Sequence, residues 1–177
     1  MSVNRDDEAL RLEIFAIGIQ ELEFWKRAVK ADNMLFEQLF YLIFSVDHRL
    51  AWRCCWIIDS ASEDFPELLT DKLTEIIAAL LTTSDGSLKR HFTRILCRYS
   101  IPENSLAGLV NRCFELLAPS EPVSVRVYAM QLLFNITLQL PDLRGELISV
   151  IENLRELGGS AGFMNRSEKL LRKLHHQ

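Results

Sequence analysis

Three arginines at intervals of four residues form the pattern in this chain that most clearly suggests binding chemistry. Arg90, Arg94 and Arg98 fall on successive turns of a predicted helix, on the side opposite Phe92. Within that helix no acid at i±4 relieves their repulsion. Because guanidinium groups bind carboxylates and phosphates in a bidentate manner, we expect the stripe to contact an acidic protein or peptide. The predicted partner-binding residues are Arg53, Arg90, Arg94, Arg98 and Arg126.

Other residue types that catalyse reactions or bind metals form no known motif in this sequence. His48 and His91 belong to different helices, and His175-His176 lie at the end of the chain. There is no HExxH, no GxSxG and no glycine loop for phosphate. We therefore predict no catalytic residue, metal site or cofactor. The cysteines lack metal-ligand spacing and are predicted to be reduced, buried thiols: Cys54, Cys55, Cys97 and Cys113.

One group of aromatic and acidic residues permits a functional hypothesis. Trp52, Trp56 and Asp59 are spaced i, i+4 and i+7, which places them on one side of a helix. Core packing is the favoured interpretation, because the two tryptophans align with Phe92 and Leu96 in a later helix. Asp59 is then expected at a polar boundary near the helix end.

A recurring tripeptide marks the helices that would position these residues. An apolar residue, a proline and an acid recur at spacings of 36 and 39 residues: Phe65-Pro66-Glu67, Ile101-Pro102-Glu103 and Leu140-Pro141-Asp142. Proline suits the first turn of a helix, and the acid complements the helix dipole. The pattern predicts helices over 66–82, 102–117 and 141–157.

A second set of helices alternates with the first. Its apolar positions Trp52, Phe92 and Ala129 are 40 and 37 residues apart, and a further step of 38 reaches Ser167. Three residues before each apolar position stands a basic residue: Arg49, Lys89 and Arg126. Lys89 is expected at the boundary of the core side, where it would serve packing between repeats. The unit is thus a pair of helices in about 37–40 residues. A single helical hairpin cannot bury its apolar face, so such units stack.

These repeats resemble the HEAT and armadillo group of proteins, whose second helix commonly opens with a Val-Arg step like Val125-Arg126. The segments HRLAWR, PVSVRVYAM and GSAGFMNRSEKLLRKL are similar to a group of small bacterial HEAT-like proteins without an assigned activity. The resemblance implies an all-α fold, an α-solenoid of about three and a half HEAT-like helical-hairpin repeats with an N-terminal helical cap. We expect one domain over 1–177, with a cap (1–32), hairpin repeats (33–157) and a C-terminal turn and helix (158–177).

The N-terminal cap is expected to cover an apolar patch of the first repeat. Residues 8–30 contain apolar positions at helical spacing. In the following helix Leu50, Cys54 and Ile57 lie opposite the predicted core, which makes that helix apolar on both sides. A helix of this kind is usually buried on both sides.

Two enzyme families offer weaker resemblances. GSAGFMNRSEK is similar to the mobile GSSxMPxKxN loop of adenylosuccinate lyases and fumarases, but it lacks the required Pro and Lys. DNA alkylation-repair glycosylases also use HEAT-like repeats, with aromatic residues and an acid near the damaged base, as Trp52, Trp56 and Asp59 would be. A glycosylase-related nucleic-acid-binding protein is therefore the alternative. The favoured interpretation is a non-enzymatic scaffold.

The charges separate between the two sets of helices. The chain has a net charge of −4, which disfavours nucleic acid as the partner. The second set of helices sums to +9. The proline-initiated helices, counted with Glu63 and Asp64 before the first of them, sum to −7. By analogy with HEAT proteins, we expect the second set to line the concave side. The separation of charge then either arises by chance, lets alternate helix layers attract one another, or forms a basic, concave face for an acidic partner. The N-terminus lacks signal-peptide features and no apolar run is long enough to span a membrane, so we expect a cytoplasmic protein without membrane contact.

Overall fold

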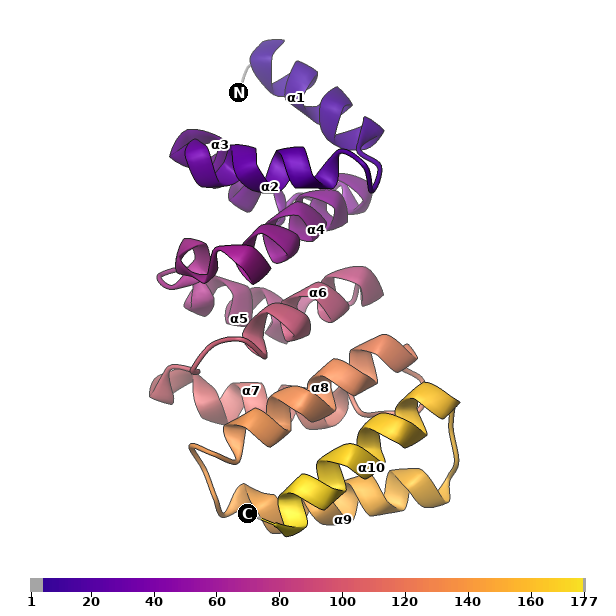
Figure 1. Cartoon of the computed structure of the whole chain (residues 1–177). Helices are drawn as coiled ribbons and strands as arrows, with labels where there is room; N and C mark the ends of the chain where they lie inside the picture. The colour runs from indigo at the N-terminus through magenta and orange to yellow at the C-terminus, as the bar shows by residue number, and fades with distance from the viewer. Residues whose placement is uncertain (1–4, 177) are drawn as a thin grey trace. The chain divides into compact units, whose positions relative to one another are not determined.

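The chain is built from α-helices. The computed structural model describes residues 5–176, in which ten α-helices and two short 3-10 helices occur and no strand is found (Figure 1). The predicted all-α class is therefore confirmed. The chain divides into two compact units, Met1–Lys72 and Leu73–Gln177, which are described separately.

The first unit is organised around one long central helix. Its elements are α1 (Arg5–Ala16), α2 (Leu22–Ala31), α3 (Asn33–Leu42), α4 (His48–Asp64) and the 3-10 helix η1 (Pro66–Leu69). Helix α4 packs against α1, α2 and α3. The helices α1 and α2 are the predicted N-terminal cap, and α3 and α4 form the first hairpin.

Both sides of α4 are buried, as the sequence predicted. Leu50, Cys54 and Ile57 are fully buried, although they point away from the side that the repeat alignment assigned to the core. Because α1 and α2 both pack on α4, these two helices supply the cover.

The tryptophans of α4 depart from the alignment. Trp52 and Trp56 are half-buried rather than central to the core, with ring centroids 6.4 Å apart. Asp59 was expected at a polar boundary and is instead fully buried. In α4 the residues directly before Trp52, Trp56 and Asp59 are buried as well, and these are Ala51, Cys55 and Ile58. The repeat alignment therefore places the core of the first hairpin about one residue out of register.

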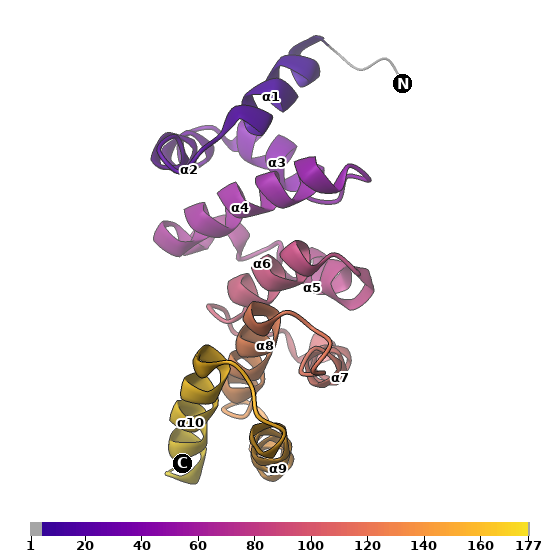
Figure 2. The same ribbon diagram turned by 90° about the vertical axis from the view of Figure 1, so that its right-hand side faces the viewer.

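The second unit consists of three helical hairpins stacked in sequence. Its helices are α5 (Leu73–Thr82), α6 (Gly86–Leu96), α7 (Leu106–Glu115), α8 (Val123–Ile136), α9 (Leu143–Glu156) and α10 (Ala161–His175). Helix α8 packs beside α6 and α10 and also against α7 and α9. Figure 2 shows the resulting layers, with α6, α8 and α10 in an inner layer and α5, α7 and α9 in an outer one. This is the stacking expected of an α-solenoid.

The predicted register of the core is confirmed in this unit. Phe92, Ala129 and Ser167 are buried to within 1% of full burial, as are Leu96 and Leu133. Each stands where the repeat spacing placed it. The periodicity of the inner helices therefore reflects a continuous core between the layers.

The proline-marked helices begin later than predicted. Pro66 opens the 3-10 helix η1, and Glu103–Ser105 forms a second one, η2, directly after Pro102. The α-helices start only at Leu73, Leu106 and Leu143. Proline sets φ for a first turn, but it does not determine whether that turn closes with 3-10 or α hydrogen bonds.

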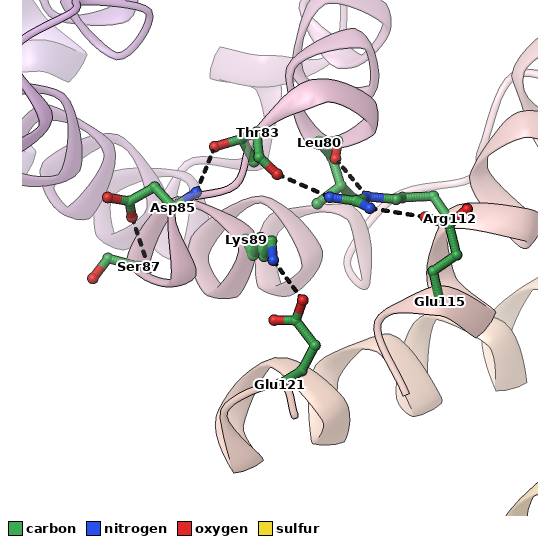
Figure 3. Close-up of polar contacts among 8 residues, drawn as sticks. All are labelled: Leu80, Thr83, Asp85, Ser87, Lys89, Arg112, Glu115 and Glu121. Atoms are coloured by element: carbon green, nitrogen blue, oxygen red, sulfur yellow. Dashed lines mark hydrogen bonds and ion pairs between the residues drawn. The ribbon is translucent and has the colours of Figure 1, made fainter. Parts of the chain in front are cut away.

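Aspartates cap the starts of α6 and α4. The carboxylate of Asp85 accepts hydrogen bonds from the backbone N–H groups of Ser87 (2.8 Å) and Leu88 (2.9 Å) at the start of α6 (Figure 3). Asp47 caps α4 in the same way. At the other end of a hairpin, Gly158 has a φ of 78° after α9, which confirms the predicted helix stop.

Truncation of the core leucines tests the register. We expect Leu96→Ala and Leu133→Ala each to lower the free energy of unfolding by about 2–5 kcal/mol, because both side chains are fully buried. Leu138→Ala serves as the control, since this side chain is 65% exposed and its truncation should cost much less. Urea unfolding followed by circular dichroism measures all three. A core variant as stable as the parent would contradict the register.

Deletion of residues 1–30 tests the cover on α4. The truncated chain should expose Leu50, Cys54 and Ile57 and should aggregate, because α1 and most of α2 would be missing. Static light scattering and binding of a hydrophobic dye measure this. A monodisperse truncation with unchanged stability would show that the cap does not cover α4.

Candidate functional site

The inner layer of the second unit carries the most one-sided charge in the chain. In α6, α8, α10 and the turn after α6, nine charged residues are basic and Glu168 alone is acidic. We use the name basic face for six of these basic residues. Three come from α6 and the turn after it, opposite the buried positions of α6, and three come from the side of α10 that faces α8. They are Arg90, Arg94, Arg98, Arg166, Lys169 and Lys173.

The predicted arginine stripe is present but is less free than its spacing implied. Arg90, Arg94 and Arg98 are all half-buried, and Arg98 lies just beyond the end of α6. Arg90 Nη2 lies 2.9 Å from Nε2 of His91. Arg94 and Arg98 each already interact within the chain. A partner of the stripe would therefore have to compete with contacts that already exist within the chain.

A chain of hydrogen bonds crosses the three inner helices. Arg166 of α10 donates to Oε1 of Gln131 (2.6 Å), whose Nε2 donates to Oδ1 of Asn135 (2.6 Å). Nδ2 of Asn135 then donates to the carbonyl oxygen of Cys97 (2.8 Å), beyond α6. These contacts fix one guanidinium of the basic face between α10 and α8, so that part of the face is preorganised. Spacing in sequence could not reveal this network, because its members come from three repeats.

Arg126 does not belong to an exposed surface. It is 6% exposed, and its Nε donates to the carbonyl oxygen of Leu117 (3.1 Å) after α7. Its guanidinium lies 4.1 Å from the centroid of the Phe163 ring in α10. Burial lowers the pKa of this group. Arg126 is thus a structural link between hairpins, and its assignment to partner binding is corrected.

Arg53 has a similar structural role in the first unit. Its Nη1 donates to the carbonyl oxygens of Ile17 (2.7 Å) and Ile14 (3.4 Å) at the end of α1. The guanidinium also lies 5.1 Å from the Trp52 ring. Ile14 belongs to the last turn of α1, whose carbonyls lack α-helical N–H donors, and Ile17 directly follows the helix. Arg53 therefore holds the cap on α4 and is not an available partner contact.

Lys89 behaves as its position on the helix predicted. It lies at the boundary of the core of α6, and its Nζ pairs with Glu121 at 2.5 Å, just before α8 (Figure 3). The same figure shows Arg112 of α7, which donates to the carbonyl oxygens of Leu80 (3.1 Å) and Thr83 (2.8 Å) at the end of α5. Both contacts join successive hairpins, which confirms that Lys89 serves packing between repeats.

The residues with catalytic potential are buried or dispersed. Asp59 is fully enclosed, so its carboxylate cannot approach a nucleobase as the glycosylase alternative requires. In the described part of the chain no three His, Cys, Asp or Glu side chains are placed to hold a metal ion. Cys54, Cys55 and Cys113 are buried and Cys97 is half-buried, all as free thiols. Burial raises the pKa of Cys54 to about 12 and raises the pKa of Cys113 as well.

Comparisons with known proteins identify one family. A family model described as HEAT repeat domain matches residues 8–174. No curated protein and no solved structure matches the chain. Among residues 5–176 the helices are all too short or too polar to cross a membrane.

The buried thiol of Cys54 makes stability depend on alkaline pH. In the unfolded chain a thiol ionises near pH 9, whereas Cys54 in the folded chain keeps its proton up to about pH 12. The unfolded state therefore binds fewer protons above pH 9, and this thiol alone should lower the free energy of unfolding by about 1.4 kcal/mol per pH unit. Urea unfolding at pH 8, 9.5 and 10.5 measures the slope, which should be shallower in Cys54→Ala. Equal slopes would contradict the burial of the thiol.

Proposed function

Because the chain belongs to the HEAT repeat family, we propose that it is a non-enzymatic module that binds an acidic segment of a partner protein through its basic face. HEAT repeats commonly act as protein-interaction scaffolds. The family match extends over nearly the whole chain and therefore covers both units.

The observation that carries the proposal is the charge of the inner layer. Nine basic residues against one acid is a strong bias in a chain whose net charge is −4. Internal contacts do not account for this excess of charge. Lys89 and Arg172 pair with carboxylates, whereas Arg126 and Arg166 donate to uncharged oxygens. The excess positive charge lies on α6 and α10, and it favours a ligand with negative charge.

Helix α10 offers the most accessible part of this surface. Lys169 and Lys173 are exposed, and within the described chain no carboxylate pairs with either of them. Arg172 is exposed too, but it pairs with Glu168. Lys169 is therefore the charge that a partner reaches most directly, whereas Arg90 lies beside His91 and Lys173 lies over the ring of Phe134.

An acidic protein suits this face better than a nucleic acid does. The whole chain is acidic, so a long polyanion would meet repulsion outside the inner layer. A short acidic segment of a protein needs only the basic face. The glycosylase alternative also loses its candidate acid, since Asp59 is buried.

Single charge reversals test the proposed face. We expect Arg90→Glu and Lys169→Glu each to weaken binding of a fluorescein-labelled octaglutamate peptide about threefold to tenfold, because each puts a like charge against the ligand. Fluorescence anisotropy at 50 mM salt measures the dissociation constant. The control is Arg27→Glu, an exposed residue of α2 that changes the net charge by the same amount outside the basic face.

Two results would overturn the proposal. One is equal weakening by Arg27→Glu, because the peptide would then sense only the net charge of the chain. The other is tighter binding of a 16-base-pair DNA duplex than of the peptide, with the same variants impaired, because the face would then serve nucleic acid. Circular dichroism confirms that each variant is folded before binding is compared.

A further inference from the structure

The first unit has a hollow whose charged side chains are acidic, whereas those of the basic face are basic. It lies between α1 and α2, is open to solvent and has a volume of about 340 Å³. Its lining combines apolar side chains with two carboxylates. The lining residues are Glu13, Ala16, Ile17, Glu21, Phe24 and Trp25.

The aromatic side chains give the hollow an accessible apolar surface. Phe24 is 69% exposed, whereas its neighbour Trp25 is buried at 6% exposure. Their ring centroids are 6.1 Å apart and the rings are nearly perpendicular. The packing of the fold thus uses Trp25 and leaves Phe24 in water. A large aromatic ring in that position can stack on a planar cation.

One of the two carboxylates is held in place by the backbone. Oε2 of Glu21 accepts a hydrogen bond from the backbone N–H of Gly18 at 2.9 Å, just before α2 begins. A Cβ atom at position 18 would lie 3.0 Å from that same oxygen, so an alanine there would make the Glu21 side chain shift. Oε1 of Glu21 is left to accept from a ligand. Arg53 also reaches this end of α1, but its guanidinium is occupied by the carbonyls of Ile14 and Ile17.

The charge of the surrounding unit favours a cation. Residues 1–72 contain eight Lys and Arg residues and fourteen Asp and Glu residues, a formal net charge of −6. A positively charged segment is therefore attracted to this unit and repelled by the basic face. The two surfaces select partners of opposite charge.

We propose that the hollow between α1 and α2 binds an arginine side chain, next to an apolar residue, from a basic segment of a partner protein. The guanidinium stacks on Phe24 and donates hydrogen bonds to Glu21 and Glu13. The aliphatic part of the arginine lies on Ala16 and Ile17. Arginine fits better than lysine, because its planar group both stacks on an aromatic ring and binds carboxylates through a rigid fork.

The probe is the peptide acetyl-Gly-Leu-Arg-Leu-Arg-Gly-amide, added to the full-length protein labelled with nitrogen-15. We expect it to shift the indole N–H signal of Trp25 in a saturable manner. A peptide with Lys in place of Arg should bind more weakly, and one with Glu should not bind. Glu13→Gln and Glu21→Gln should each raise the dissociation constant about threefold to tenfold, as the loss of one charge-assisted hydrogen bond predicts. Phe24→Ala should weaken binding in the same way without unfolding the chain, since the ring is exposed.

Two controls make the test specific. Glu8→Gln removes the same charge from an exposed position of α1 outside the hollow and should leave binding unchanged. Gly18→Ala should weaken binding as Glu21→Gln does, because the added Cβ displaces the carboxylate, and it should have no further effect in the Glu21→Gln background.

Three outcomes would overturn the inference. Glu8→Gln could weaken binding as much as Glu13→Gln does, which would mean that only general charge matters. The Glu peptide could shift the Trp25 signal equally. Light scattering could show a dimer that Glu21→Gln dissociates, in which case the occupant is a second copy of this chain and not a partner segment.

Discussion

Each helix end in this chain leaves backbone carbonyl groups without a helical partner, and the fold depends on how these are satisfied. The last four carbonyls of every helix lack a helical N–H donor. Because the helices of this chain are short, such unsatisfied carbonyls are frequent. Arginines from a neighbouring element satisfy them repeatedly. Arg53 binds the end of α1, Arg112 binds the end of α5, and Arg126 binds the carbonyl of Leu117 after α7. In each case one side chain satisfies a helix end and also joins two hairpins or layers, so stacking and hydrogen bonding are secured by the same contact.

This constraint explains which arginines the sequence could assign and which it could not. A helical projection gives the direction of a Cα–Cβ bond, but an arginine side chain is long enough to turn back toward a carbonyl on another element. Arg53 and Arg126 were predicted to meet a partner, yet both are occupied by such carbonyls. The role of Lys89 was predicted correctly, because a side chain at the boundary of the core can extend only toward the next hairpin, where Glu121 lies. The periodicity of a repeat thus predicts a structural charge best where the side chain has few alternatives.

The fold itself was largely accessible from the sequence, because the spacing of apolar residues records the core directly. The register of Phe92, Ala129 and Ser167 is correct to the residue, and so is the helix stop at Gly158. The first hairpin was less predictable. Helix α4 is covered on one side by α1 and α2, which have no counterpart in the later repeats, so Trp52 and Asp59 do not follow the pattern of α6 and α8. The helix starts after proline were also misplaced, since the choice between 3-10 and α turns depends on tertiary packing.

The candidate surfaces differ in how well the sequence could reveal them, and the reason lies in how each is assembled. The basic face is a property of composition, because counting charges helix by helix already shows the excess on α6 and α10. The hollow between α1 and α2 is a property of geometry. Its two carboxylates are eight residues apart with a loop between them, and one of them accepts a hydrogen bond from the backbone N–H of Gly18. No helical spacing connects such residues. Charge excess can therefore be read from a sequence of repeats, whereas a site formed where the repeat pattern ends requires the folded chain.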